Sequence, residues 1–215
     1  HSNFTELRIV NMGVISNGTT LLDAGAIDSG IPTGVMTLIK TLTASSSTNL
    51  SFVDGASSVV LDNTYKEYVF KYINIHPAND DVNFSVNFRD GGSAYDATKT
   101  STYFRSNHHE DNSATSLAYD GSLDLAQVTG VQGLTENSGN DADQSTSGYI
   151  HLFDPSNTTF VKHYRSENNT TLGGNISVNN FVAGYCNVTA AIDGVQFSFS
   201  AGAIASGTIK MYGIK

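Results

Sequence analysis

The chain has 215 residues, of which 39% are hydrophobic and only 14% charged, and its formal net charge is −9. This acidic balance argues against binding to nucleic acid or to an anionic membrane surface, because both need clustered Lys and Arg. No apolar run of about 18 residues occurs, so we expect no membrane insertion.

The composition favours strands over helices. Ser, Thr, Asn and Gly make up 87 of the 215 residues. Ser, Thr and Asn compete for backbone hydrogen bonds in a helix and Gly adds chain entropy, whereas all four suit turns and the outer faces of strands. The single cysteine, Cys186, excludes an internal disulfide and a cysteine-based zinc site, and its apolar neighbours predict a buried thiol.

Residues 1–34 differ in texture from the rest and predict a short N-terminal β arm. "ELRIVNMGVI" and "TTLLDAGAI" are typical of two short strands around the turn signal Ser16-Asn17-Gly18, and 28–34 reads as a connector. These apolar stretches are too small to bury a core, so we interpret 1–34 as an arm for attachment or oligomerisation. Because the chain does not begin with Met, we expect a processed product or an excised fragment.

From about residue 35 onward, strand signals recur at short intervals. "YKEYVFKYINI" at 65–75 places three aromatic residues on one face and Val69, Ile73 and Ile75 on the other, which predicts a central strand. The turn signal "HPANDD" at 76–81 predicts a hairpin that leads into "VNFSVNFRDGG" at 82–92. That stretch alternates, with Val and Phe predicted for the core and Asn and Ser for solvent.

Later strand signals are "STYFRS", "SGYIHLF", "TTFVKHYRS", "NNFVAGYCNVTAA", "GVQFSFS" and "GTIKMYGI". Many strands and no amphipathic helix predict an all-β fold over 35–215, a jelly-roll-like antiparallel β-sandwich. At most a helical turn is expected within 122–130. The segments 106–116 and 133–147 are predicted as long loops, and long loops on a rigid sandwich commonly carry binding sites.

"SNHHEDN" at 106–112 brings together His108, His109, Glu110 and Asp111. These residue types suit a metal site or an acid–base pair, but adjacent side chains on an extended segment point in opposite directions, so the two histidines do not readily share one ion. A solvated polar loop is the favoured interpretation. Within such a loop, His108 and His109 are candidate receptor or glycan contacts.

"NDADQSTSG" at 140–148 carries Asp141, Asp143 and Ser145. Alternate oxygen-bearing side chains are how a loop turns ligands toward Ca²⁺, so these three residues are a candidate Ca²⁺ site. The segment lacks the central glycine and the distal Glu of an EF-hand. A turn of Asp and Ser without metal is therefore favoured, and we expect no other cofactor.

"HLFDPSNTTFVKHYRS" at 151–166 predicts a hairpin rich in aromatic and basic side chains. With the turn at 154–157, His151 would lie across from Lys162 or His163. Exposed side chains of these types stack on sugar rings and hydrogen-bond their hydroxyls, although an ordinary amphipathic hairpin is the favoured alternative. The candidate contacts with a receptor or glycan from this region are Tyr149, His151, Lys162, His163 and Tyr164.

We expect no enzymatic activity. No Gly-x-Ser-x-Gly elbow marks a nucleophile, and the five Glu residues are scattered, so no carboxylate pair for glycoside cleavage is singled out. A glycan depolymerase or esterase is the enzymatic alternative. Depolymerases commonly use a long repetitive β-helix, and no internal repeat of that kind is visible.

Five stretches carry a resemblance that covers about 35–215. They are "GVMTLIKTLTASSSTNLSFVDG", "YKEYVFKYINIHPANDD", "FRDGGSAYDATKTSTYF", "HLFDPSNTTFVKHY" and the C-terminal "SGTIKMYGIK", the last being the most specific. Together they resemble virion structural proteins of tailed phages that infect marine bacteria, notably cyanophages. The resemblance implies a non-enzymatic appendage or fibre-tip domain with a jelly-roll-like sandwich that commonly forms trimers.

The expected function is therefore a phage tail-fibre or receptor-binding domain on the virion surface, which contacts a host glycan or outer-membrane protein through its loops. The expected partners are further copies of the chain, as a homotrimer, and other virion proteins that bind the N-terminal arm. A capsid-decoration, collar or fibre-shaft subunit with a purely structural role is the main alternative.

Overall fold

The computed structural model describes residues 14–16, 19–23, 26–27 and 35–215. The chain divides into two compact units, His1–Val35 and Met36–Lys215. In the first unit, strands β1 (Val14–Ser16), β2 (Thr19–Asp23) and β3 (Ala26–Ile27) form an antiparallel sheet in that order. The predicted pairing of two strands around the Ser16-Asn17-Gly18 signal is confirmed by β1 and β2. The remainder of the predicted arm, 1–13, 17–18, 24–25 and 28–34, lies outside the described residues.

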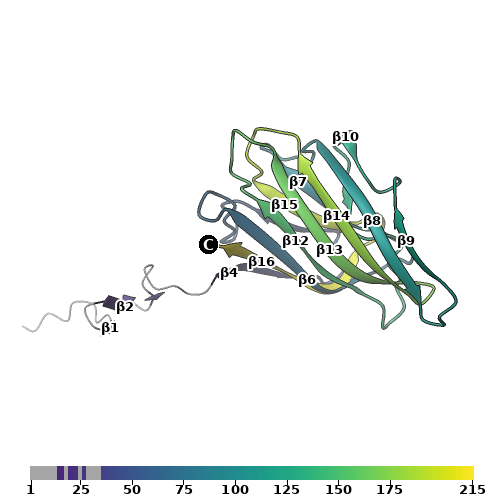
Figure 1. Ribbon diagram of the computed structural model, residues 1–215. Helices are drawn as coiled ribbons and strands as arrows, with labels where there is room; N and C mark the ends of the chain where they lie inside the picture. Colours follow the sequence, from purple (N-terminus) through teal and green to yellow (C-terminus); the bar gives the residue numbers. More distant parts are fainter. Residues whose placement is uncertain (1–13, 17–18, 24–25, 28–34) are drawn as a thin grey trace, which may run out of the picture. The chain divides into compact units, whose positions relative to one another are not determined.

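The second unit contains a large and a small antiparallel sheet (Figure 1). The large sheet consists of β4 (Met36–Thr43), β6 (Glu67–Pro77), β8 (Lys99–His109), β9 (Thr115–Tyr119), β10 (Ala126–Val128), β12 (Thr146–Phe153), β13 (Lys162–Leu172), β14 (Ile176–Cys186) and β16 (Ile204–Ile214). Its strand order is β10-β8-β14-β13-β12-β6-β16-β4, and β9 pairs with the outer side of β8. The small sheet consists of β5 (Leu50–Val53), β7 (Phe84–Arg89), β11 (Gln132–Gly133) and β15 (Gly194–Phe199), in the order β11-β7-β15-β5.

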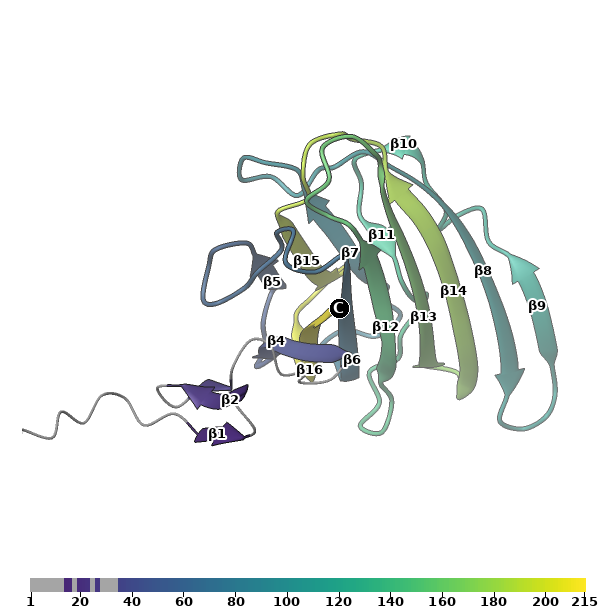
Figure 2. The same cartoon turned by 60° about the vertical axis from the view of Figure 1, so that its left-hand side comes forward.

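The two sheets pack face to face, which confirms the predicted all-β antiparallel sandwich. Figure 2 shows the small sheet over one part of the large sheet only, with β8 and β9 extending beyond it. The large sheet has nine strands and the small sheet four. Strands β12, β13 and β14, which are consecutive in sequence, are also neighbours in the large sheet. In the described part of the chain, no helix is long and apolar enough to cross a membrane.

Aromatic side chains fill the core where the two sheets oppose each other. Phe70 and Tyr72 of β6 pack against Phe197 of β15, with ring centroids 5.7 and 6.0 Å apart. Phe84 of β7 stacks on Phe197 at 5.8 Å, and Phe52 of β5 meets Phe70 edge-on at 5.2 Å. All five are at most 1% exposed, and burial of each ring contributes about 1.5–3 kcal/mol. Their contacts clamp the small sheet onto the middle of the large one.

The segment 76–81 is a crossing between sheets, so the predicted hairpin is wrong. β6 belongs to the large sheet and pairs with β12 and β16, as expected for a central strand, whereas β7 belongs to the small sheet and pairs with β11 and β15. A turn of Pro, Asn and Asp reverses the chain in either arrangement. The turn signal alone therefore does not distinguish a hairpin from a connection between layers.

A β-bulge at Asn74 changes which residues of β6 face the core. Asn74 has a φ of +52°, and the pairing of β6 with β16 shifts register beside it. Ile75 is therefore fully buried on the same side as Tyr72, while Ile73 faces outward and is 44% exposed. The predicted common face for Val69, Ile73 and Ile75 is wrong at Ile75, because strict alternation fails at a bulge.

The outer face of the small sheet is covered where alternation predicted solvent. Ser85 and Asn87 of β7 are only 2% and 7% exposed. The Asn87 side chain donates a hydrogen bond to the Thr129 carbonyl at 3.3 Å, and β11 pairs with β7 along Ser85 and Val86. The chain from 129 onward thus lies over this part of β7.

The segment 120–146 closes the part of the large sheet that the small sheet leaves open. Its backbone and side chains bond to the inner faces of β8 and β13: Tyr164 donates to Gln132 Oε1 at 3.0 Å, and Asn168 Nδ2 donates to the Leu134 carbonyl at 2.9 Å. Arg105 pairs with Glu136 and, at 3.6 Å, with Asp120. Polar residues therefore form much of this half of the interior.

Both predicted long loops are thereby corrected. β8 runs to His109 and β9 begins at Thr115, which leaves only a short turn in 106–116. Much of 133–147 is buried and hydrogen-bonded to the sheet, because it closes one end of the sandwich. Within 122–130 the structure has a turn followed by β10, and no helix forms there.

Gly184 of β14 is expected to be essential because Tyr164 and the Thr100 backbone pack closely against it. A Cβ at this position would lie 2.6 Å from the Thr100 carbonyl oxygen and 2.7 Å from the Tyr164 hydroxyl. We predict that Gly184→Ala lowers the free energy of unfolding by about 1–3 kcal/mol, measured by urea denaturation. Gly121→Ala, where a Cβ meets nothing within 4 Å, is the matched control and should change stability little. Equal stability of the two variants would contradict the prediction.

Candidate ligand-binding face

The outer face of the large sheet gathers aromatic and basic side chains over β12, β13, β14 and β8. β14 pairs with β13 from Cys186 to Ile176 without a register shift, and with β8 over the same span. Because side chains alternate along a strand, His163, Arg165 and Glu167 of β13 face outward while their neighbours face the interior. The register places these residues beside Tyr185, Ala183 and Phe181 of β14 respectively.

A hollow of about 440 Å³ lies on this face between the ends of β12, β13, β14 and β8. Phe153, His163 and Tyr185 supply its aromatic lining, and Arg165 also borders it. The rings of His163 and Tyr185 are 5.9 Å apart and inclined by 59°. Ala183 and Thr102 are small outward-facing residues, and they leave the space beside these aromatic side chains open.

A second hollow, of about 270 Å³, adjoins the first and shares Arg165 and Ala183 with it. Phe104 of β8 and Phe181 of β14 line it, and their rings stack at 4.8 Å with an interplanar angle of 10°. Phe104 is 41% exposed. Tyr185 and Phe181 lie four residues apart on β14, about 13 Å along the strand. The two hollows thus form a shallow surface longer than one aromatic ring.

Polar groups at the margin of this surface are held by their neighbours. His151 pairs with Glu67 and stacks on Phe153, with ring centroids 6.1 Å apart. Tyr149 donates a hydrogen bond to Glu167 at 2.8 Å, and this bond raises the pKa of the Tyr149 hydroxyl. These contacts fix the orientation of two aromatic side chains beside the hollows.

The structure places three of the seven predicted contact residues near the hollows, and a fourth, His108, on the same face at the far end of β8. Tyr149, His151 and His163 all point outward from β12 and β13. His151 faces Arg165 across the strands, not Lys162 or His163 as predicted, because the loop between β12 and β13 is longer than the expected turn. His163 is the only one of the three that lines a hollow.

Lys162 and Tyr164 are buried, so the prediction that they are exposed contacts is wrong. Lys162 is fully buried and Tyr164 is 2% exposed. Because side chains alternate along a strand, both lie on the opposite side of β13 from His163 and point into the sandwich. There Lys162 Nζ donates a hydrogen bond to the Val188 carbonyl at 3.0 Å. An alternating strand with polar residues on both faces gives no hydrophobic signal for which face is buried.

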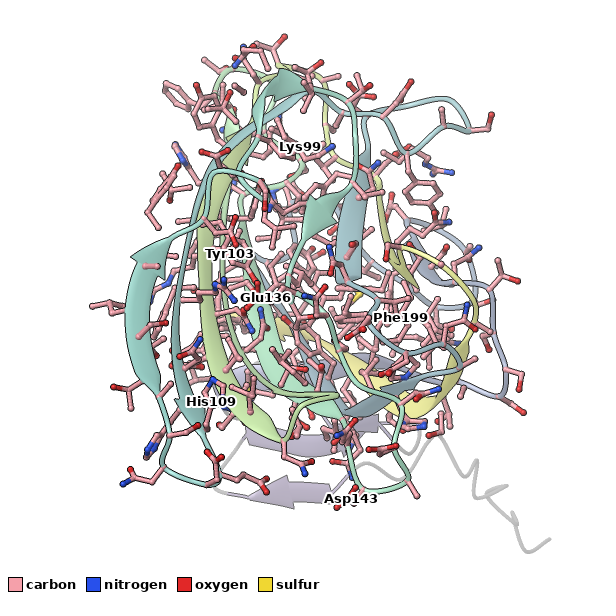
Figure 3. All side chains as sticks on the ribbon, turned by 90° about the vertical axis from the view of Figure 1, so that its right-hand side faces the viewer. Lys99, Tyr103, His109, Glu136, Asp143 and Phe199 are labelled. Atoms are coloured by element: carbon pink, nitrogen blue, oxygen red, sulfur yellow. The ribbon has the colours of Figure 1, made fainter. Side chains whose placement is uncertain are left out.

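His108 and His109 lie at the far end of β8 from the first hollow. Lys99 and His109 mark the two ends of this strand (Figure 3). His108 is exposed and its ring bonds to Asn112 at 3.1 Å, while His109, Glu110 and Asp111 border a separate hollow with Gly174 and Asn175. The structure therefore separates these two histidines from Tyr149, His151 and His163.

Of the three candidate Ca²⁺ ligands, Asp143 and Ser145 border one hollow together with Asn74 and His76, whereas Asp141 does not line it. Asp141 and Asp143 are exposed, whereas Gln144, which follows Asp143, is buried. The side-chain amide oxygen of Gln144 accepts a hydrogen bond from the Asp141 backbone N–H at 3.2 Å. Within 35–215 and the short described strands before it, no three His, Cys, Asp or Glu side chains are placed to hold a metal ion. The backbone arrangement is that of a capped turn.

Cys186 is buried, as the apolar residues around it in the sequence predicted. Within the sheet it lies between two buried lysines. Lys162 of β13 and Lys99 of β8 flank it in register, and all three are fully buried. Burial raises the pKa of the Cys186 thiol to about 12, and burial lowers the pKa of Lys99 to about 8. Lys99 Nζ donates to Asn87 Oδ1 at 2.5 Å and to the Ala97 carbonyl at 2.7 Å.

Four aromatic residues of the face were missed from the sequence: Phe104, Phe153, Phe181 and Tyr185. A signal for the last two was present. In "NNFVAGYC" the even positions Val182 and Cys186 are apolar and face the core, so Phe181 and Tyr185 must face outward. Phe104 could be identified only from its contact with Phe181 on β14, because a single exposed Phe does not by itself indicate a binding site.

Comparison with protein-family models, with curated proteins and with solved structures found no match to this chain.

The buried Lys99 ammonium predicts a pH-dependent stability. Between about pH 8 and 10.5 the unfolded chain binds the Lys99 proton more tightly than the folded chain, so the free energy of unfolding rises with pH through this window. Relative to Lys99→Met, the native chain should gain about 2–3 kcal/mol between these limits. Urea denaturation at several pH values measures the difference.

The comparison with Lys99→Met isolates this contribution because Cys186 acts in the opposite direction. Its raised pKa makes the folded chain retain a proton that the unfolded chain releases above about pH 9, which lowers stability as the pH rises. Lys71→Met, at an exposed position on β6, is the matched control. Parallel pH profiles for the native chain and Lys99→Met would contradict the prediction.

Proposed function

We propose that this protein is a non-enzymatic, glycan-binding domain of a phage virion appendage, a tail fibre or receptor-binding protein, and that it binds through the outer face of its large sheet. The observation that carries the glycan assignment is the pair of adjoining hollows lined by Tyr185, His163, Phe181 and Phe104 around Arg165. The phage assignment is supported by the resemblance of 35–215 to virion proteins of marine phages.

The chemistry of this face suits sugar rings. Aromatic side chains pack against the apolar C–H faces of a ring, and Arg, His and Tyr offer donors to its hydroxyls. Thr100 and Thr102 add hydroxyl groups at the rim of the first hollow. A shallow surface of this type contacts part of an oligosaccharide and leaves the remainder in solvent.

A rigid support favours binding at such a surface. The outward residues belong to strands whose inner faces are buried beneath the hollows, so little side-chain or loop ordering is required when a ligand binds. The loops proposed from the sequence are replaced by strand positions as the contact region. In this proposal the N-terminal arm attaches the domain to other virion proteins.

Affinity at one shallow site is weak, and assembly as a homotrimer compensates for it. Three linked copies convert the second and third contacts on a cell surface into intramolecular events, which raises avidity without new contacts. The outcome is a virion-surface domain that recognises repeated sugar units on a bacterium.

Truncation of the lining should reduce glycan binding. The native chain is applied to a printed glycan array, and the bound glycans are then titrated against the native chain and Tyr185→Ala. We expect about a tenfold loss of affinity, because an aromatic anchor is removed. Leu117→Ala is the control: Leu117 is 74% exposed on β9 and lines neither hollow. Absence of glycan binding by the native chain would overturn the proposal, as would equal loss in both variants.

The oligomeric state is a separate prediction. Sedimentation-velocity centrifugation of the full chain should give a species of three times the 22.8 kDa chain mass. A monomer at micromolar concentration would contradict the homotrimer while leaving the glycan-binding face to be judged by the array.

A further inference from the structure

The two hollows are lined by basic side chains, although the chain as a whole is acidic. The chain has a net charge of −9, yet neither hollow has a carboxylate among its lining residues, while Arg165 lines both and His163 lines the first. Among the described residues, Arg165 forms no ion pair and donates no side-chain hydrogen bond to another side chain or to the backbone. An exposed guanidinium without a partner therefore lies where the two hollows meet.

The acidic residues at the margin are all engaged elsewhere. Glu67 pairs with His151, and Asp154, next to Phe153, pairs with Lys66 at 3.0 Å. Glu167 accepts hydrogen bonds from Tyr149 at 2.8 Å and from Asn179 Nδ2 at 3.3 Å. Within the described residues no carboxylate pairs with Arg165, although Glu67 and Glu167 lie on neighbouring positions of the same face.

We propose that the glycan recognised by this face carries an anionic group, a carboxylate or sulfate on a sugar ring, which binds Arg165 while the neighbouring ring packs against Tyr185 and His163. This inference rests on the proposed function and specifies its ligand class. A guanidinium presents two parallel donors that match a carboxylate or sulfate, and such charge-assisted bonds are stronger than those between neutral groups.

The shared position of Arg165 also predicts how the ligand extends. A sugar unit bound to Arg165 has the His163–Tyr185 pair on one side and the stacked Phe104–Phe181 pair on the other. These pairs lie about 13 Å apart along β14, so the ligand is an oligosaccharide with a neutral or acidic unit on each side of the charged one.

The test compares one glycan with and without its charge. An acidic glycan bound on the array is treated so that its carboxylates are reduced to alcohols, or its sulfates removed, and both forms are titrated against the native chain, Arg165→Gln and Arg165→Lys. We expect the native chain to lose about tenfold in affinity for the neutralised glycan. Arg165→Gln should bind both forms with that lower affinity, and Arg165→Lys should retain part of the preference.

Two further readouts separate charge recognition from a change in structure. The preference of the native chain should weaken as NaCl is raised, because salt screens an exposed ion pair. Lys71→Gln, which removes an exposed positive charge from β6 outside both hollows, is the matched control and should retain the preference.

The failures of the two proposals are distinguishable. Binding of neutral glycans that equals binding of acidic ones, or an unchanged preference in Arg165→Gln, overturns the anionic ligand and leaves the glycan-binding function intact. Absence of binding to every glycan on the array, acidic and neutral, overturns the proposed function itself and the anionic ligand with it.

Discussion

The structure depends on one constraint, the unbroken antiparallel register of β13, β14 and β8. β14 pairs with both neighbours along its full length of 11 residues, from Ile176 to Cys186, without a bulge. A shift by one residue would turn the buried row around Cys186 to solvent and bury Arg165 and His163 in its place. The composition of the core and of the proposed binding face is therefore decided by the same set of backbone hydrogen bonds.

That register is costly to shift because the inner side is polar but bonded. Tyr72 and Ser166 share a hydrogen bond at 2.8 Å, and Tyr103 donates to Asn180 Oδ1 at 2.6 Å, deep in the sandwich. A buried polar group without a partner costs about 1–3 kcal/mol, so a displaced strand would lose several such bonds together. An apolar interior would tolerate displacement better, since hydrophobic contact is not directional.

The parts of the fold that could be predicted from the sequence are those governed by local pattern. Alternation in 82–92 identified the face of β7 that packs against the large sheet, and the aromatic stretch at 65–75 identified β6 as central, apart from the bulge at Asn74. Alternation does not encode which sheet a strand joins, so the passage from β6 to β7 was taken for a hairpin. It also cannot reveal that a later segment, 120–146, covers residues such as Ser85 and Asn87.

The candidate site was only partly predictable for a related reason. The hairpin at 151–166 was correctly located as β12 and β13, and Tyr149, His151 and His163 do face solvent. Lys162 and Tyr164 were assigned to the same surface because β13 carries polar residues on both sides, and hydropathy then gives no indication of direction. The contributions of Phe104 and Phe181 arise from contact between strands that are distant in sequence.

Two neighbouring residues of β14 connect the interior with the proposed binding face. Gly184 points inward and leaves space for Tyr164, while Ala183 points outward and leaves the gap between Tyr185 and Phe181. A larger residue at 183 would fill both hollows without disturbing the core, whereas one at 184 would press on the Thr100 backbone and disturb the sheet below. Small residues at adjacent positions thus serve opposite faces, and only the outer one is free to vary with the ligand. We therefore expect ligand specificity to be adjustable at 183 at little cost in stability, because the strand register that supports it lies beneath and does not change.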